Sequence, residues 1–534
     1  MSMTCGEATM RLLARYGVTT VFGIPGVHTL DICRGLSGGA NAGAIHHVRA
    51  RNEQGAGYMA EGWARATGQV GVAVVISGPG VTNASTAVGQ CYADSLPMLL
   101  ISAEPDSRSL GKGWGVLHEI TDQKRVTEPM TAFSATAACA ADIPDLMARA
   151  FSVFASSRPR PVQISLPMDV QAEMVDEIWE PVPLPGRPVA DPLLIDQAAD
   201  LLRGAKRPLI LPGGGANAAS ADLTAIAEML GAAVIPSSAG KGIVPDDHPL
   251  SLSAAMGKPE VRDFAARADV ILAVGTELAE TDSYVPRMDL PGDIIRVDID
   301  PAKISDLYPP KLGIVGDAGP AMAALRKALA GARPAQDITP ELENVRASIT
   351  ATLNPSERQH MRLLAVMEDC APDGLIWSAD ATQIAYTALF GLPTRAPRRW
   401  MYPAGFCALG NALPNAIGAK MAYPATPVAV LVGDGGFMFT MPELMAAAEQ
   451  GLALPIILWN NGVLKQIRDD MDLRDIERVG VEGLNPDFAM LARSCQCHAA
   501  TPASEAEFRA AFAEALTADR PTLIEMREGS DWLL

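Results

Sequence analysis

One stretch of the chain, residues 427–461, constrains the fold more than any other. It holds two short apolar runs, each followed by glycine or polar residues, with a helical pattern between them: 427–432, Gly433-Asp434-Gly435-Gly436, 441–450, 454–459 and Asn460-Asn461. Apolar runs on both sides of a helix-length segment are typical of a strand–helix–strand unit with buried, parallel strands. Because both strands point the same way, Asp434 and Asn461 should lie at neighbouring carboxyl ends, where open α/β sheets bind ligands.

The residues predicted at this edge have chemistry in common. Asp434 offers a carboxylate and Asn461 an amide oxygen, and both are hard ligands that suit Mg²⁺ or Ca²⁺ better than zinc. The three glycines around Asp434 let backbone N–H groups approach an anion, and the helix that follows adds its positive N-terminal dipole. A metal ion beside an anion cradle indicates a diphosphate ligand. The alternative, a tight turn that happens to contain an aspartate, is disfavoured by the paired asparagines downstream.

These two motifs together resemble the thiamine diphosphate signature of the superfamily of acetolactate synthases and 2-oxo acid decarboxylases, and the resemblance covers essentially the whole chain. It implies that Asp434, Asn461 and the carbonyl of Val463 hold Mg²⁺ against the diphosphate of the cofactor. It also implies a set of further cofactor-binding residues: Glu53, Asn83, Thr382, Leu409, Gly433, Gly435 and Gly436. In this comparison Leu409 takes the bulky apolar position that bends the bound cofactor; an ordinary core leucine is the alternative.

Length and pattern predict the architecture. At 534 residues the chain is too long for one core and suggests three domains. Alternating strand and helix patterns predict an α/β protein of three doubly wound parallel-sheet domains: a pyrimidine-binding domain over 1–170, a middle domain over 187–335 and a diphosphate-binding domain over 355–534. A proline-rich linker, 171–186, and a polar connector, 336–354, separate them.

Composition excludes several classes of protein. No run of 18 apolar residues occurs, so a membrane partner is not expected. The start of the chain lacks the pattern of a signal peptide, and the eight cysteines form no CxxC pair, which favours a reduced chain in the cytoplasm. A net charge of −18 argues against nucleic acid as a partner.

Glu53 is the principal candidate for proton transfer. An acidic residue in the first turn of a helix usually only complements the helix dipole. Here, however, the segment 51–56 is similar to the activating-glutamate segment of the superfamily. The resemblance implies that the Glu53 carboxyl bonds N1′ of the aminopyrimidine and governs removal of the thiazolium C2 proton. Many relatives have His before this Glu, whereas this chain has Asn52, so an acid–base role at that position is not expected.

Residues in three loops are candidates for contact with the substrate. The loop 23–29, with Gly26 and His28, corresponds to one that relatives bring over the thiazolium; a loop histidine with only structural partners is the alternative for His28. Glu104 replaces a glutamine that acetolactate synthases usually have. His118 lies beside Glu119 in a glycine-rich loop at which those synthases tend to have Gln-Glu.

The middle domain shows strands that end in glycine, as at 208–215 and 270–275, which alone are weak evidence for a dinucleotide site. Acetolactate synthases hold FAD there, typically with an arginine-containing segment after the second of these strands. This chain has 276–282, Thr-Glu-Leu-Ala-Glu-Thr-Asp, at that place. A structural middle domain is therefore expected, with FAD as the less favoured alternative.

The predicted function is thiamine diphosphate-dependent, non-oxidative decarboxylation of a small-molecule 2-oxo acid. The segments 23–29, 117–119 and 275–282 are most similar to decarboxylases of 5-guanidino-2-oxopentanoate, and Met168 replaces a substrate-facing lysine of biosynthetic acetolactate synthases. An acetolactate synthase-like carboligase is the alternative. A non-catalytic relative would be expected to lose Glu53 or the metal pair. The resemblance also implies a homodimer or homotetramer with active sites shared between subunits.

The guanidino substrate suggests roles for two carboxylates. A buried guanidinium needs a carboxylate partner to replace its water. Glu104 and Glu119 lie on loops expected to overhang the thiazolium. The alternative is that both are solvated or paired with Arg108, Lys112 or Lys465.

Overall fold

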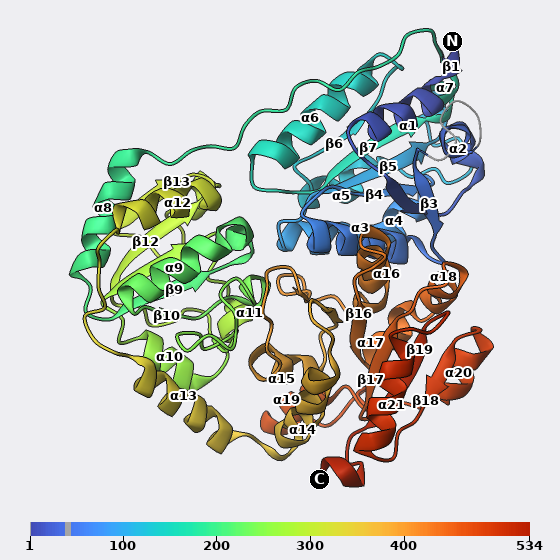
Figure 1. Cartoon of the computed structure of the whole chain (residues 1–534). Coiled ribbons are helices and arrows are strands. Elements are labelled where there is room, and N and C mark those ends of the chain that lie inside the picture. Colours follow the sequence, from blue (N-terminus) through green and yellow to red (C-terminus); the bar gives the residue numbers. More distant parts are fainter. Residues whose placement is uncertain (1, 38–43) are drawn as a thin grey trace.

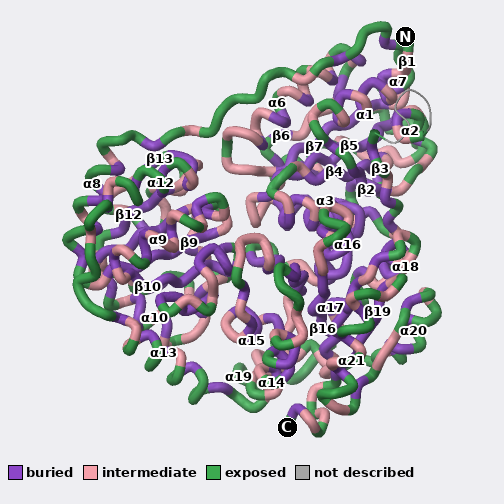
Figure 2. The backbone as a smooth tube through the Cα atoms, in the orientation of Figure 1, coloured by how far each residue is buried: buried purple, intermediate pink, exposed green. Residues whose placement is uncertain are grey.

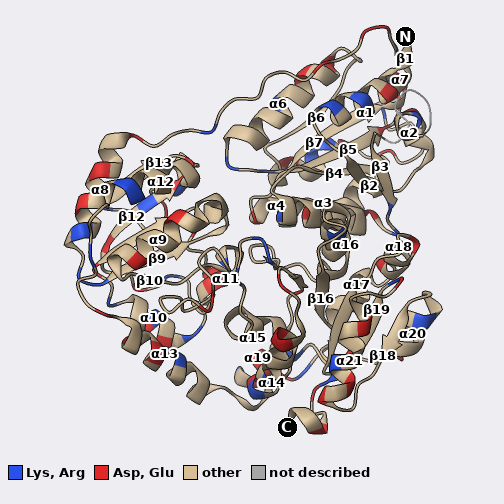
Figure 3. Cartoon of the chain, viewed as in Figure 1, with Lys and Arg blue, Asp and Glu red and all other residues tan. Residues whose placement is uncertain are grey.

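A computed structural model describes residues 2–37 and 44–534 as three α/β domains, each built on its own parallel sheet (Figure 1). The N-terminal domain is drawn blue to cyan, the middle domain green to yellow and the C-terminal domain orange to red. The predicted fold class is confirmed. Acidic residues occur on all three domains and are not gathered on one of them (Figure 3).

The N-terminal domain has a six-stranded parallel sheet in the order β3-β2-β4-β5-β7-β6. Its strands are β2 Thr20–Gly23, β3 His46–Arg49, β4 Gly71–Val75, β5 Met98–Glu104, β6 Phe133–Thr136 and β7 Val162–Pro167. Its helices are α1 Cys5–Arg15, α2 Leu30–Leu36, α3 Glu53–Thr67, α4 Pro79–Ala93, α5 Lys124–Thr127, α6 Asp142–Ser156 and α7 Met168–Ala172. Two short strands, β1 Met3–Thr4 and β8 Met174–Val175, pair antiparallel at its edge.

Local sequence explains the ends of these elements. Thr4 caps α1 and forms a reciprocal capping box with Glu7. α3 ends at Gly68, whose φ of 75° favours glycine.

Every residue of β4 and β5 is buried, as expected of central strands with helices on both faces.

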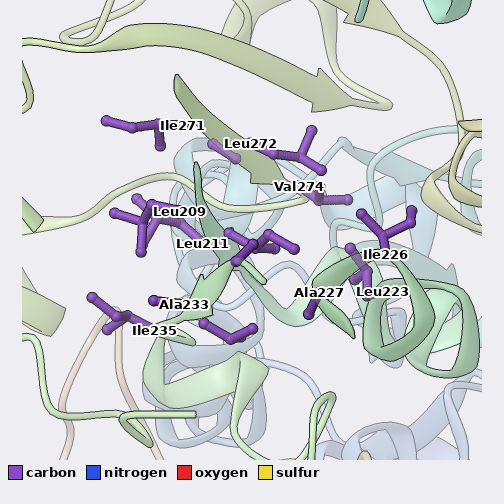
Figure 4. Close-up of a cluster of buried hydrophobic side chains, with 14 of the residues drawn as sticks. Leu209, Leu211, Leu223, Ile226, Ala227, Ala233, Ile235, Ile271, Leu272 and Val274 are labelled. Carbon is purple, nitrogen blue, oxygen red and sulfur yellow. The ribbon is translucent and has the colours of Figure 1, made fainter. Parts of the chain in front are cut away.

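The middle domain has a five-stranded parallel sheet in the order β10-β9-β11-β12-β13. Its strands are β9 Pro208–Pro212, β10 Ala233–Val234, β11 Val270–Val274, β12 Asp293–Asp298 and β13 Leu312–Val315. Its helices are α8 Pro192–Gly204, α9 Ser220–Leu230, α10 Pro259–Ala265, α11 Glu280–Ser283 and α12 Ala318–Ala328. Figure 4 shows strand residues such as Leu211 and Val274 beside Leu223 and Ile226 of α9; all belong to one buried cluster.

The segment 336–354, which polarity marks as a connector, is mostly a helix, α13 Thr339–Thr352. Leu342, Val345 and Ile349 recur at helical spacing, and all three are buried in the core of the middle domain. α13 contacts α10 along that domain. The high proportion of polar residues reflects the solvent-facing side of the helix and does not indicate an unstructured linker.

The C-terminal domain has a six-stranded parallel sheet in the order β15-β14-β16-β17-β19-β18. Its strands are β14 Ile376–Ala379, β15 Trp400–Met401, β16 Val428–Gly433, β17 Pro455–Asn460, β18 His498–Ala500 and β19 Thr522–Arg527. Its helices are α14 Pro355–Cys370, α15 Gln383–Gly391, α16 Ala412–Ala422, α17 Asp434–Thr440, α18 Glu443–Glu449, α19 Lys465–Leu473, α20 Phe488–Ser494 and α21 Glu505–Ala515.

Two helices connect β16 to β17 where the sequence predicts one. α17 begins at Asp434 itself, and α18 lies within the helix expected over 441–450. Pro442 lies between them and has no N–H to continue the hydrogen bonding of α17. The strands of the unit are parallel, and Gly433 pairs in register with Trp459, so the residues that follow each strand meet at one edge.

The N- and C-terminal domains share a core, whereas the middle domain has its own. α3 packs against α16 so closely that a Cβ atom at Gly62 would lie 2.1 Å from the carbonyl oxygen of Asn415. Beside this contact Asn415 donates to the buried carboxylate of Glu61, which also accepts from Arg65. Figure 2 shows buried backbone on both sides of the contact.

In the described parts of the chain, no helix has the length and apolar character needed to cross a membrane. All eight cysteines are described, and all carry unpaired thiols.

The close approach of α3 and α16 predicts a large effect for one added methyl group. Gly62→Ala should lower the free energy of unfolding by about 1–3 kcal/mol or more, because the backbone of α16 cannot move without disturbing the shared core. Urea unfolding followed by fluorescence measures this. Gly204→Ala, at the exposed end of α8 with no atom near its added Cβ, is the control and should stay near wild type. Equal midpoints for both variants would contradict the prediction.

Candidate functional site

The structure places the predicted site residues in two groups. One group lies at the carboxyl edge of the C-terminal sheet: Thr382, Leu409, Gly433, Asp434, Gly435, Gly436, Asn461 and Val463. The other group lies in the N-terminal domain: Gly26, His28, Glu53, Asn83, Glu104 and His118.

Asp434 is the buried acidic residue of the first group. One of its carboxylate oxygens accepts a hydrogen bond from the N–H of Gly462 at 2.9 Å and from the side-chain amide of Asn485 at 2.6 Å. Gly462 directly follows Asn461, whose own amide oxygen accepts from the N–H of Val463 at 3.2 Å. Asp434 therefore lies opposite the turn that holds the other two predicted metal ligands, Asn461 and Val463, as the strand–helix–strand interpretation requires.

The donor set at this edge fits a divalent cation. Asp434 is 6% exposed, and within residues 2–37 and 44–534 no lysine, arginine or histidine pairs with it. An unpaired buried carboxylate is unfavourable unless a positive charge is supplied. Carboxylate, amide and carbonyl oxygens, as at Asp434, Asn461 and Val463, are the donors that Mg²⁺ prefers.

The glycines of this edge lie where side chains would collide with their surroundings. A Cβ atom at Gly433 would lie 2.5 Å from the hydroxyl oxygen of Thr382, and one at Gly436 would lie 2.8 Å from a carboxylate oxygen of Asp380. Gly435 remains half-buried above them at the start of α17. The backbone can therefore run close to Thr382 and Asp380 here, and it leads into the start of α17, where helix N–H groups suit an anion.

Asp380, which the sequence analysis does not single out, lies beneath this cradle. It is fully buried, and its carboxylate accepts from the N–H of Gly410 at 2.7 Å and of Ala381 at 2.8 Å. Burial raises the pKa of Asp380 to about 7, although these two N–H donors lower it. The bond to Gly410 fixes the neighbouring Leu409, which is half-buried and belongs to none of the core clusters.

Glu53 is the first residue of α3 and is buried at 9% exposure. Its carboxylate accepts from the side-chain amide of Asn83, on α4, at 2.9 Å. Asn52 caps the helix, since its side-chain oxygen accepts from the N–H of Gln54. The residue that replaces the histidine of many relatives therefore has a structural role at the start of α3.

The three predicted substrate loops meet in a histidine cluster. The His28 ring contacts the hydroxyl of Ser77 through Nδ1, and its centroid lies 5.0 Å from that of His118. Burial, with a smaller effect of His118, lowers the pKa of His28, which favours the neutral ring. His118 has a φ of 62°, and its buried Nδ1 has no hydrogen-bond partner among the described residues. Gly26 packs closely on Ile76, next to this cluster.

The two carboxylates near this cluster have different environments. Glu104 is 6% exposed and lines a small cavity that His118 and Gln123 also line. Burial raises its pKa, although a hydrogen bond from Thr136 lowers it. Glu119 instead accepts from three backbone N–H groups of its own loop, those of Gly113, Gly115 and Val116. Two of the three residues named as alternative partners of these glutamates, Arg108 and Lys465, instead pair with Asp106 and Asp469.

A separate hollow of about 390 Å³ lies over the carboxyl ends of the middle-domain strands. Glycines 213–215, Thr276 and Asp298 line it, together with Arg158 of the N-terminal domain. Arg158 forms an ion pair with Glu277, and Asp282 accepts from Ser238, so the segment 276–282 is held by protein contacts. The expectation that this domain is structural, with FAD less favoured, stays a prediction.

Comparison with known proteins identifies the class of protein. Three family models match in order: the N-terminal TPP binding domain of thiamine pyrophosphate enzymes over residues 3–126, their central domain over 195–325 and their C-terminal TPP binding domain over 380–526. Thiamine pyrophosphate is another name for thiamine diphosphate. The chain belongs to the thiamine pyrophosphate enzyme family, as its two motifs predict.

The relatives of the chain include a probable decarboxylase and acetolactate synthases. The chain is 47% identical to the probable 2-ketoarginine decarboxylase AruI of Pseudomonas aeruginosa, over 98% of this chain and 94% of the relative. It is 31% identical to the acetolactate synthase large subunit of Corynebacterium glutamicum, over 99% of this chain and 87% of that subunit. An acetolactate synthase of Mycobacterium bovis is also 31% identical, over 93% of this chain and 83% of its own length.

Asp380 gives a pH prediction. Because folding raises its pKa from the ordinary 3.8 to about 7, the folded chain binds this proton more tightly, and stability is lost as pH rises through that window. The difference in Tm between Asp380→Asn and wild type, without cofactor, should therefore shift in favour of the variant between pH 6 and pH 8. Asp373→Asn, on an exposed loop, is the control. A difference in Tm that does not change with pH would contradict the prediction.

Proposed function

We propose that this enzyme uses thiamine diphosphate and Mg²⁺ to decarboxylate 5-guanidino-2-oxopentanoate, also called 2-ketoarginine, without oxidation. The buried Glu104 carboxyl beside the histidine cluster carries the choice of substrate, because a guanidinium needs such a partner when it leaves water. The 47% identity to a relative named for 2-ketoarginine supports the same choice.

Asp434, Asn461 and the Val463 carbonyl would hold the Mg²⁺ ion, and the N–H groups at the start of α17 would face the diphosphate. Thr382 and Leu409 border this cradle, and Leu409 would pack on the cofactor with its exposed side. Thiamine diphosphate, when bound, supplies the carbon nucleophile and the electron sink for loss of CO₂ from a 2-oxo acid.

The remaining residues would transfer protons and bind the substrate. The Glu53 carboxyl, steadied by Asn83, would hold and exchange the proton at N1′ of the aminopyrimidine. His28 and His118 would give or take a proton at the substrate, since burial lowers the pKa of His28 and Nδ1 of His118 has no hydrogen-bond partner among the described residues. Glu104 would bind the guanidinium, and a bidentate pair of this kind selects long basic 2-oxo acids.

A second copy of the chain would complete the site. None of the hydrogen bonds of the described residues joins Glu53 to Asp434 or Asn461. Exposed apolar residues flank both groups, Leu30 and Trp114 in the N-terminal domain and Phe439 and Ile467 in the C-terminal domain. A homodimer in which Glu53 of one subunit faces the metal edge of the other accounts for both, and two such dimers would form a homotetramer. The unpaired cysteines support the cytoplasm as its compartment.

Acetolactate synthases at 31% identity over nearly the whole chain keep a carboligase as the second candidate. The two functions differ in product: a decarboxylase releases an aldehyde, and a carboligase joins the decarboxylated fragment to an acceptor. Product analysis with 5-guanidino-2-oxopentanoate and with pyruvate separates them.

Substitutions at the two groups should have different effects. Asp434→Ala should abolish Mg²⁺-dependent retention of thiamine diphosphate, because it removes the one carboxylate of the metal site. Glu53→Gln should leave cofactor affinity near wild type and lower kcat by about a hundredfold or more, because it removes a proton-transfer group. Calorimetry and CO₂ release measure the two quantities. Unchanged affinity in Asp434→Ala would disprove the metal assignment, and unchanged kcat in Glu53→Gln would disprove the role of Glu53.

Glu104 should control substrate preference. Glu104→Gln should lower the ratio of kcat/KM for 5-guanidino-2-oxopentanoate over pyruvate by about 1–3 kcal/mol, or roughly tenfold to a hundredfold, because a charged pair is lost. Glu128→Gln, an exposed glutamate on the same domain, is the matched control and should keep the ratio. If wild type prefers pyruvate and yields acetolactate, the carboligase replaces the decarboxylase as the function.

A further inference from the structure

A buried carboxylate of the C-terminal domain contacts the backbone next to Glu53. Glu443, the first residue of α18, is 1% exposed. One of its oxygens accepts from the N–H of Arg51 at 3.1 Å and of Asn52 at 3.0 Å, and the other also accepts from Arg51 at 3.1 Å. Asn52 is the cap of α3, and Glu53 follows it.

These bonds satisfy N–H groups that the helix itself cannot use. The peptide groups of residues 51 and 52 precede α3, so their N–H groups have no partner within the helix. Without Glu443 they would be donors left unpaired at a domain boundary, which destabilises the arrangement that presents them. The position of Glu53 thus depends on a side chain that lies 390 residues further along the chain.

The contact between Glu443 and the start of α3 is tightly packed. A Cβ atom at Gly55 would lie 2.1 Å from a carboxylate oxygen of Glu443. The pKa of Glu443 is raised to about 7, chiefly by burial. The nearby charge of Glu53 adds to this rise, and the N–H bonds from Arg51 and Asn52 oppose it. The opposite end of α18 contacts the same segment differently: Glu449 forms ion pairs with the guanidinium groups of Arg49 and Arg51, and these pairs are partly exposed.

We propose that Glu443 is a positioning residue, which holds the 51–52 backbone and so sets where the Glu53 carboxyl meets the cofactor. The inference rests on the proposed role of Glu53 and adds a specific cause for its placement. Since α17 and α18 follow one another from Asp434, the same short run of chain carries the metal ligand and the residue that positions Glu53.

The test measures proton exchange at C2 of bound thiamine diphosphate, because this step needs Glu53 but no 2-oxo acid. Full-length wild type, Glu443→Gln, Glu443→Ala, Glu449→Gln and Glu53→Gln are each loaded with thiamine diphosphate and Mg²⁺. Exchange into deuterated buffer is stopped by acid at set times and read by proton NMR. Calorimetry gives the cofactor Kd of each variant, which separates binding from placement.

Glu443→Gln should slow exchange by about tenfold to a hundredfold, the effect expected of a misplaced group, and leave the cofactor Kd within about threefold of wild type. Glu443→Ala should slow exchange at least as much as Glu443→Gln under conditions in which the variant is folded. Glu449→Gln should exchange within about twofold of wild type, because exposed ion pairs contribute little.

The outcomes separate the inference from the function on which it rests. If Glu53→Gln is slow and Glu443→Gln exchanges at the wild-type rate, the inference fails and the proposed function stands. If Glu53→Gln itself exchanges at the wild-type rate, or wild type binds no thiamine diphosphate, both fail. Slowing in Glu449→Gln equal to that in Glu443→Gln would also overturn the inference, because loss of any contact of α18 would then suffice.

Discussion

The close packing of α3 against α16 is the contact on which the arrangement of the site depends. It admits no side chain at Gly62, and it places the N- and C-terminal domains around one shared core. The start of α3 is thereby held against α18, where Glu443 bonds the backbone of Arg51 and Asn52. The middle domain has a separate core.

Three buried carboxylates of the C-terminal domain have different partners. Asp380 and Glu443 accept from backbone N–H groups, which partly replace water, yet burial still raises the pKa of each to about 7. Asp434 accepts from Gly462 and Asn485 and lacks a positive partner in the described part of the chain. The first two carboxyls brace the local backbone, whereas Asp434 remains available for a cation.

The substrate loops show that residue type alone does not decide a role. Glu104 and Glu119 are both glutamates on loops near the histidine cluster. Glu119 accepts from three N–H groups of its own loop. Glu104 lines a cavity, and among the residues that the structure describes only the Thr136 hydroxyl donates to it. Glu104 is therefore the better candidate for the proposed guanidinium partner, whereas Glu119 shapes the loop that carries His118.

The sequence by itself determined the three-domain α/β fold, the family and the meeting of Asp434 with the turn after β17, because these follow from apolar runs, glycine positions and local motifs. The sequence did not predict the helix α13, because the segment is mostly polar. A few apolar residues at helical spacing are enough to bury one face of a helix. Only the tertiary structure decided that Asn485, Asp380 and Glu443 join the site region. Asp380 and Asn485 contact residues that lie 30 or more positions away in the chain, and Glu443 bonds across a domain boundary, so these contacts leave no local pattern in the sequence.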